Sequence, residues 1–152
     1  MKIAEALSER SDLQKRIAQI RERLSNNALV QEGENPSEDP EELLAQLDRM
    51  TDRLTELVTA INLTNAAVKD GSETITALIS KRDAMILHID ILRSFVTKSS
   101  EKVYRSRGSE IVIKSTMNVR ALQKRIDEEA KKLRELETRI QGLNWTTDLI
   151  EQ

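Results

Sequence analysis

Cysteine is absent from this 152-residue sequence, and aromatic residues make up only 2% of it. Without cysteine the chain has no disulfide framework, no thiol nucleophile and no cysteine-based zinc site. Glycine and proline are also scarce, with four and two residues, and the glycines are scattered singly. That spacing excludes a glycine-rich phosphate loop. We therefore predict a protein without a bound cofactor.

The sequence also lacks a strong net charge and a long apolar run. The formal charge is −2, so no overall positive field attracts nucleic acid or an acidic membrane surface. The most apolar run, 84–89, is far shorter than the ~20 residues that span a bilayer. The first ten residues are too charged for a signal peptide. We predict a cytoplasmic chain, with neither membrane nor nucleic acid as its partner.

Charged residues, in contrast, make up 33% of the sequence, a composition typical of long helices. The last third of the chain shows the clearest pattern, because its apolar residues recur at alternating spacings of three and four, interrupted only at Glu129 and Thr147. This series comprises Val119, Leu122, Ile126, Leu133, Leu136, Ile140, Leu143 and Ile150. It predicts one face of a helix about 50 Å long, which needs partner helices to cover it.

Similar patterns predict three further helices. The four helices span about residues 2–26, 40–68, 72–98 and 117–150. Asp39 is expected to cap the second helix with Pro40 at its first position, and Ser72 to cap the third. Ala28–Gln31 fits either a short strand or loop residues that dock on the helices, and 102–114 favours a small β-hairpin.

These elements predict an all-α fold in a single domain over residues 1–152. The heptad-like spacing favours an antiparallel four-helix bundle with coiled-coil-like packing and a small β-hairpin or strand pair at one end. In such a bundle the first and third connections lie at one end, and the second connection lies at the other end with both termini.

The first connection is acidic and the third is basic. Seven carboxylates occur from Glu32 to Asp48 before any basic residue. The two connections either complement each other within the fold, or the third forms a basic tip that binds phosphate or an acidic partner. The residues proposed for that tip are Lys102, Arg105, Arg107 and Lys114.

The ends of the second and fourth helices share an Asn-x-Thr pattern. Both helices run toward the same end of the predicted bundle, so the two segments should lie at a similar height. Thr64 and Thr147 fall on the apolar faces, where a buried hydroxyl needs a partner. The candidate polar layer comprises Asn62, Thr64, Asn65, Asn144, Thr146 and Thr147. It either sets helix register or binds a ligand.

Helical periodicity places several large apolar residues on helix faces that are predicted to be exposed to solvent. They are Leu63, Leu87, Ile91, Phe95 and Trp145. A helix that is apolar on two faces is usually buried on both, so these residues indicate a homo-oligomer. The alternative is a wider core within one chain.

No catalytic or metal site emerges from the pattern. His88 is the only histidine, so the paired Glu-x-x-His metal site of helical bundles is excluded. Every predicted helix carries exposed carboxylates, and no pair stands out as acid and base. We predict that the protein is not an enzyme.

Four segments together resemble the septicolysin-like family of small bacterial proteins, over essentially the whole chain. They are Lys2–Leu7 (KIAEAL), Leu24–Glu34 (LSNNALVQEGE), Ile61–Ala66 (INLTNA) and Leu143–Thr147 (LNWTT). The resemblance implies a cell-lysing toxin.

The residues themselves favour a different function, a self-associating helical protein in protein–protein interaction or scaffolding, with an unidentified protein partner as a further option. The alternatives are a membrane-perturbing cytolysin and, more weakly, binding of nucleic acid or a small ligand at the bundle end.

Overall fold

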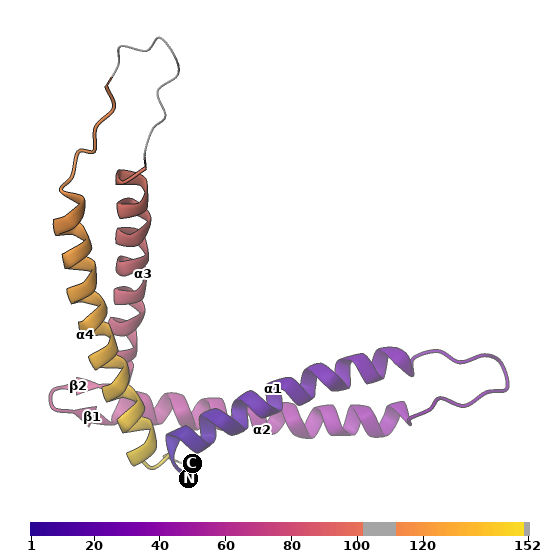
Figure 1. Cartoon of the computed structure of the whole chain (residues 1–152). Helices are drawn as coiled ribbons and strands as arrows, with labels where there is room; N and C mark the ends of the chain where they lie inside the picture. The colour runs from indigo at the N-terminus through magenta and orange to yellow at the C-terminus, as the bar shows by residue number, and fades with distance from the viewer. Residues whose placement is uncertain (102–111, 151–152) are drawn as a thin grey trace. The chain divides into compact units, whose positions relative to one another are not determined.

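The computed structural model describes residues 1–101 and 112–150. Within these residues the chain is all-α, with four helices and one two-stranded antiparallel sheet, which confirms the predicted fold class (Figure 1). The elements in chain order are α1 (Ile3–Asn26), α2 (Pro40–Ala67), β1 (Lys69–Asp70), β2 (Glu73–Thr74), α3 (Ile75–Ser99) and α4 (Val119–Thr146).

The chain divides into two compact units. Unit 1 comprises Met1–Ile75 with Gln141–Gln152, and unit 2 comprises Thr76–Ile140. Each unit is described by itself below, and the single domain stays a prediction.

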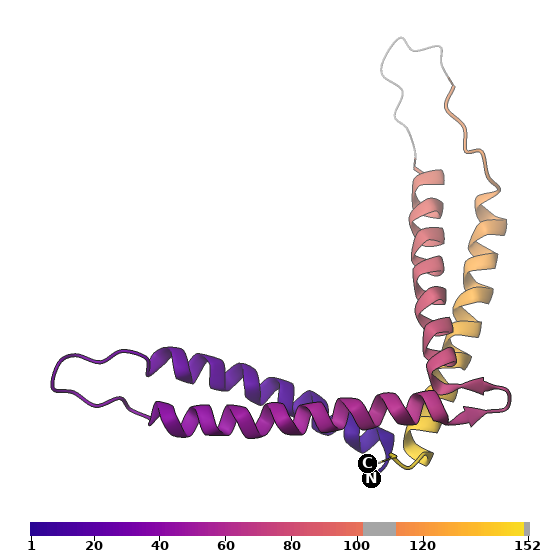
Figure 2. The same cartoon turned by 180° about the vertical axis from the view of Figure 1, so that it is seen from behind.

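Unit 1 contains the antiparallel helices α1 and α2 (Figures 1 and 2). The start of α2 follows the prediction, because Asp39 Oδ1 accepts a hydrogen bond of 3.0 Å from the N–H of Glu41, and Pro40 occupies the first turn. The two helices meet through apolar side chains spaced three, four or seven apart. The buried members of this cluster are Ala6, Leu13, Leu57 and Ile61, and Leu7, Met50, Leu54 and Leu149 pack against them.

The small hairpin lies at the end of α2, where β1 and β2 pair Lys69 with Thr74 and Asp70 with Glu73. Gly71 has a φ of +65°, a conformation that suits the first loop position of a tight hairpin. Ser72 therefore lies in the hairpin turn, and the prediction that it caps the third helix is wrong. Of the hairpin predicted over 102–114, residues 102–111 lie outside the described residues, and 112–114 form no strand.

Unit 2 contains most of the antiparallel helices α3 and α4, whose Ile75 and 141–146 belong to unit 1 (Figure 1). Asn118 caps α4, since its Oδ1 accepts from the N–H of Ala121 at 3.1 Å and its carbonyl accepts from Leu122 at 3.0 Å. Some of the apolar residues predicted to form one face of each helix meet in a cluster. Its buried members are Ile89, Leu122 and Ile126, packed by Leu92, Val96 and Leu133.

Candidate interaction surfaces

The first candidate site is a terminal clasp in unit 1, formed by Met1–Ile3 and Thr147–Ile150. Helix α4 ends at Thr146, four residues before the predicted end, and the chain then pairs with the N-terminal residues. The N–H of Ile3 donates to the carbonyl of Thr147 at 3.1 Å, and the N–H of Leu149 donates to Met1 at 2.8 Å. These backbone hydrogen bonds replace the last helical turn that the sequence predicts.

The side chain of Lys2 strengthens the terminal clasp. Its Nζ lies 2.8 Å from Asp148 Oδ1 and donates to the carbonyl of Thr146 at 3.1 Å. The hydrogen bond from Lys2 holds the pKa of Asp148 below its ordinary value. Both charged groups lie at the surface, so the pair orients the two segments more than it stabilises them.

Thr64 connects α2 to the terminal clasp. Its buried hydroxyl donates to the carbonyl of Ala60 at 2.7 Å and accepts from the N–H of Ile150 at 2.9 Å. The end of α2 and the segment after α4 therefore meet in unit 1. The contact joins the side chain of Thr64 to the backbone of Ile150, so no side chain of the second Asn-x-Thr segment takes part in it.

The other residues of the predicted polar layer are less enclosed. Asn62 and Thr146 are exposed, and Asn65, Asn144 and Thr147 are half-buried. Thr146 bonds back to Gly142 in its own helix at 2.9 Å. The Oδ1 atom of Asn65 is enclosed without a hydrogen-bond partner among the described residues. The buried polar contact is thus one hydroxyl with two partners.

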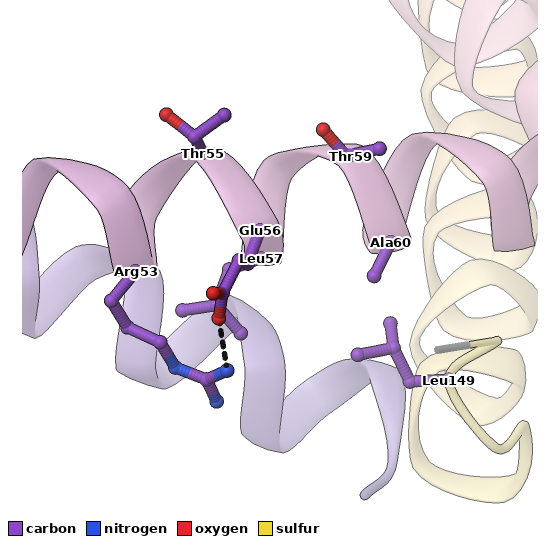
Figure 3. A pocket seen from close by; sticks show the side chains of 7 residues that line it. All are labelled: Arg53, Thr55, Glu56, Leu57, Thr59, Ala60 and Leu149. Atoms are coloured by element: carbon purple, nitrogen blue, oxygen red, sulfur yellow. Dashed lines mark hydrogen bonds and ion pairs between the residues drawn. The ribbon is translucent and has the colours of Figure 1, made fainter. Parts of the chain in front are cut away.

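A cavity of about 610 Å³ runs along α2 in unit 1 (Figure 3). Arg53 borders it and is already paired, with its Nε 2.8 Å from Glu9 and its Nη1 3.1 Å from Glu56. The hydrogen bonds that Arg53 donates to Glu9 raise the pKa of Arg53 and lower the pKa of Glu9. Figure 3 shows Thr55 and Thr59 on the opposite side of α2 from Arg53. The charged group at this cavity is therefore already engaged in an ion pair within the chain.

The second candidate site is the α3 face, which comprises Ala84, Leu87, Ile91 and Phe95. All four residues are exposed, with 64% of Leu87 and 60% of Ile91 open to solvent. The opposite side of the helix carries buried Ile89, so α3 is apolar on both sides. Of the other residues proposed for self-association, Leu63 is 38% and Trp145 67% exposed.

A groove of about 320 Å³ lies between α3 and α4 in unit 2, lined by Lys81, Met85, Lys132, Glu135, Leu136 and Arg139. Arg125, Lys132 and Arg139 are seven residues apart along α4, so they follow one line of the helix. We call these three residues the basic row. Lys81 and Phe95 are 14 residues apart on α3, so Phe95 lies on the same line of the helix as Lys81, which lines this groove.

The third candidate site is the connector tip between α1 and α2, which comprises Leu29, Val30, Glu32 and Glu34. Leu29 is 90% and Val30 50% exposed. Of the two predicted forms of Ala28–Gln31, the structure has the loop, but its apolar side chains do not dock on the helices.

The shape of this connector is fixed from inside the unit. Asn27 is buried, its Nδ2 donates to the carbonyl of Arg23 at 2.9 Å, and its Oδ1 accepts from the N–H of Glu38 at 3.0 Å. Arg23 also donates through Nε to the Glu38 carboxylate at 3.0 Å, which lowers the pKa of Glu38. Leu29 and Val30 were not among the predicted site residues, although two apolar residues before an acidic loop are a usable signal.

The predicted basic tip is only partly described. Lys114 is exposed, and Lys102, Arg105 and Arg107 lie outside the described residues. His88 is exposed on α3. Over residues 1–101 and 112–150, no group of three His, Asp or Glu side chains could hold a metal ion, and no helix is long and apolar enough to cross a membrane.

The fold and these surfaces define a class of small helical proteins built from paired antiparallel helices. The chain belongs to DUF6847, a family of unknown function whose sequence profile matches residues 10–149. It is similar to the crystal structure of a functionally unknown conserved protein from Corynebacterium diphtheriae, with 35% identity over 99% of both chains and a TM-score of 0.89. A search of curated proteins finds no match. The septicolysin-like resemblance stays a prediction.

Proposed function

We propose that this chain is a cytoplasmic, non-enzymatic protein that self-associates and acts in protein–protein interaction or scaffolding. The α3 face carries the proposal, because Leu87 and Ile91 are each at least 60% exposed on a helix whose other side is packed. Burying such apolar side chains contributes roughly 25 cal/mol per Å². A contiguous exposed apolar face of this kind marks a contact surface.

Trp145 gives further support. It is the only tryptophan in the sequence, and 67% of it is exposed in α4. Tryptophan is enriched at the energetic centres of protein interfaces, because one side chain buries a large area with few rotatable bonds. An exposed tryptophan on an ordered helix therefore fits an interaction protein.

Sedimentation velocity over a concentration series up to about 100 μM tests self-association. We expect the wild-type protein to gain mass with concentration. The double variant Leu87→Ser/Ile91→Ser should weaken association at least ~10-fold, and Trp145→Ala should weaken it ~3-fold or more, with helicity retained in both.

Ile113→Ser is the matched control, since Ile113 is 66% exposed but lies in the connector before α4. It should associate like the wild-type protein. A wild-type protein that stays monomeric at the highest concentration would overturn the proposed function.

The second candidate is membrane perturbation, which the septicolysin-like resemblance implies. The observation in its favour is the same α3 face, because helices that lie in a membrane surface expose Leu, Ile and Phe. Exposed Asp83 and Asp90 on α3 oppose it. Dye release from anionic phosphatidylglycerol vesicles, lost in Leu87→Ser/Ile91→Ser, would favour this candidate over scaffolding.

A further inference from the structure

Charge is divided unequally between the two units. Unit 1 carries nine Lys and Arg residues against 17 Asp and Glu residues, a formal charge of −8. Unit 2 carries 15 Lys and Arg residues against nine Asp and Glu residues, a formal charge of +6. The overall charge of −2 hides this separation. Two copies of the chain thus offer each other surfaces of opposite sign.

The connector tip is the acidic surface best suited to dock. Its carboxylates Glu32 and Glu34 are exposed beside Leu29 and Val30, so it combines negative charge with apolar area. The hydrogen bonds of Asn27 hold the connector at both ends. Little ordering is then needed on binding, which lowers the entropic cost of association.

The α3 face has the complementary character. Leu87, Ile91 and Phe95 supply apolar area, and the α3–α4 groove is lined by Lys132 and Arg139 of the basic row together with Glu135. Lys132 is also paired with Glu129 at 3.4 Å. A bound surface would meet apolar side chains at its centre and positive charge along one edge. Apolar cores with charged rims are the usual anatomy of protein interfaces.

We infer that the connector tip of one copy docks on the α3 face of a second copy, with Glu32 and Glu34 along the basic row. This inference rests on the proposed function and names the surfaces that self-association would use. A second copy is the occupant that the charges favour, because each chain carries both halves of the contact.

Charge reversal tests the pairing. In sedimentation equilibrium at low salt, Glu32→Lys/Glu34→Lys and Arg125→Glu/Lys132→Glu should each weaken self-association ~10-fold or more, because like charges then face each other. An equimolar mixture of the two variants should assemble again. The basic tip of Glu32→Lys/Glu34→Lys can then face the acidic row of Arg125→Glu/Lys132→Glu, and the acidic tip of the second variant can face the basic row of the first.

Neighbouring residues supply the controls. Lys124→Glu/Lys131→Glu makes the same change of charge as Arg125→Glu/Lys132→Glu at exposed positions about 100° further round α4. Asp12→Lys/Asp52→Lys makes the same change of charge as Glu32→Lys/Glu34→Lys at exposed helix positions of unit 1. Both should associate within ~2-fold of the wild-type protein.

The outcomes separate the two proposals. A wild-type protein that associates while Glu32→Lys/Glu34→Lys associates equally well overturns the docking inference and leaves the proposed function standing. Loss of association in the Lys124→Glu/Lys131→Glu control would also overturn it, because charge in general and not this surface would then govern assembly. A monomeric wild-type protein overturns both.

Discussion

Thr64 satisfies two backbone groups through one buried hydroxyl. It donates to Ala60 in its own helix and accepts from the N–H of Ile150, 86 residues later. The first bond, from a threonine hydroxyl to the carbonyl four residues earlier, is common in helices. The second bond joins two segments that are distant in the sequence. Removal of the hydroxyl therefore affects more than α2.

Thr64→Val keeps the shape of the side chain but leaves the N–H of Ile150 without its acceptor. We expect a loss of about 1–2 kcal/mol in the free energy of unfolding, measured by urea denaturation, and faster amide exchange at Ile150. Thr64→Ser keeps the hydroxyl and should protect Ile150 like the wild-type protein. Equal exchange in Thr64→Val and Thr64→Ser would contradict this role.

The pair of Glu9 and Arg53 links α1 to α2, with two hydrogen bonds of 2.8 and 3.1 Å. These bonds hold the pKa of Glu9 below 4.5, its ordinary value. The unfolded chain then binds a proton at higher pH than the folded chain. The stability that the pair contributes is thus present above pH 4.5 and is lost as the pH falls through the lowered pKa of Glu9.

Glu9→Gln should reduce this dependence on acid. We expect it to lower the free energy of unfolding by less than about 1 kcal/mol at neutral pH, since the pair is partly exposed and screened by solvent. The curves of the variant and the wild-type protein should converge as the pH falls from about 5 to 3. Glu22→Gln, at an exposed position of α1, should run parallel to the wild-type protein, and parallel curves for Glu9→Gln would contradict the prediction.

Helix boundaries were predictable where the chemistry that sets them is local. The side chains of Asp39 and Pro40 favour a helix start at these positions, and α2 begins at Pro40 with Asp39 as its N-cap. The end of α4 was missed because it depends on Met1 and Ile3, whose backbone groups leave no mark on the sequence near Thr147. The hairpin at Gly71 was missed because strands of two residues show no alternation.

The candidate surfaces divide in a similar way. Periodicity alone placed Leu87, Ile91 and Phe95 away from the packed side of α3, and the structure leaves them exposed. Leu29 lies in a loop, where helical periodicity does not predict which side chains are exposed. Its exposure follows from the shape of the connector, which the hydrogen bonds of Asn27 and the turn after Gln31 set. The separation of charge is present in the composition, but it becomes visible only when the boundaries of the units are known.

The opposite charges of the two units predict that assembly responds to salt. The screening length falls from about 10 Å at 0.1 M to about 3 Å at 1 M, so we expect self-association to weaken ~10-fold over this range. Sedimentation equilibrium at both salt concentrations measures the change. Glu32→Lys/Glu34→Lys should lose most of this dependence. Association that is unchanged or stronger at 1 M salt would indicate a contact through apolar surface alone.

The terminal clasp also constrains when the protein can finish folding. The N–H of Ile3 can bond only after Thr147 has been translated, and the hydroxyl of Thr64 can accept only after Ile150 has been translated. On the ribosome, α1 and α2 emerge first and can pair early, because their contacts need only the first half of the chain. The end of the α1–α2 pair that contains Ile3 and Thr64 lacks these contacts until all of unit 2 has been translated. The segment Met1–Ile3 is therefore among the last to complete its contacts, although it is translated before unit 2, and a nascent chain released early would keep that end frayed.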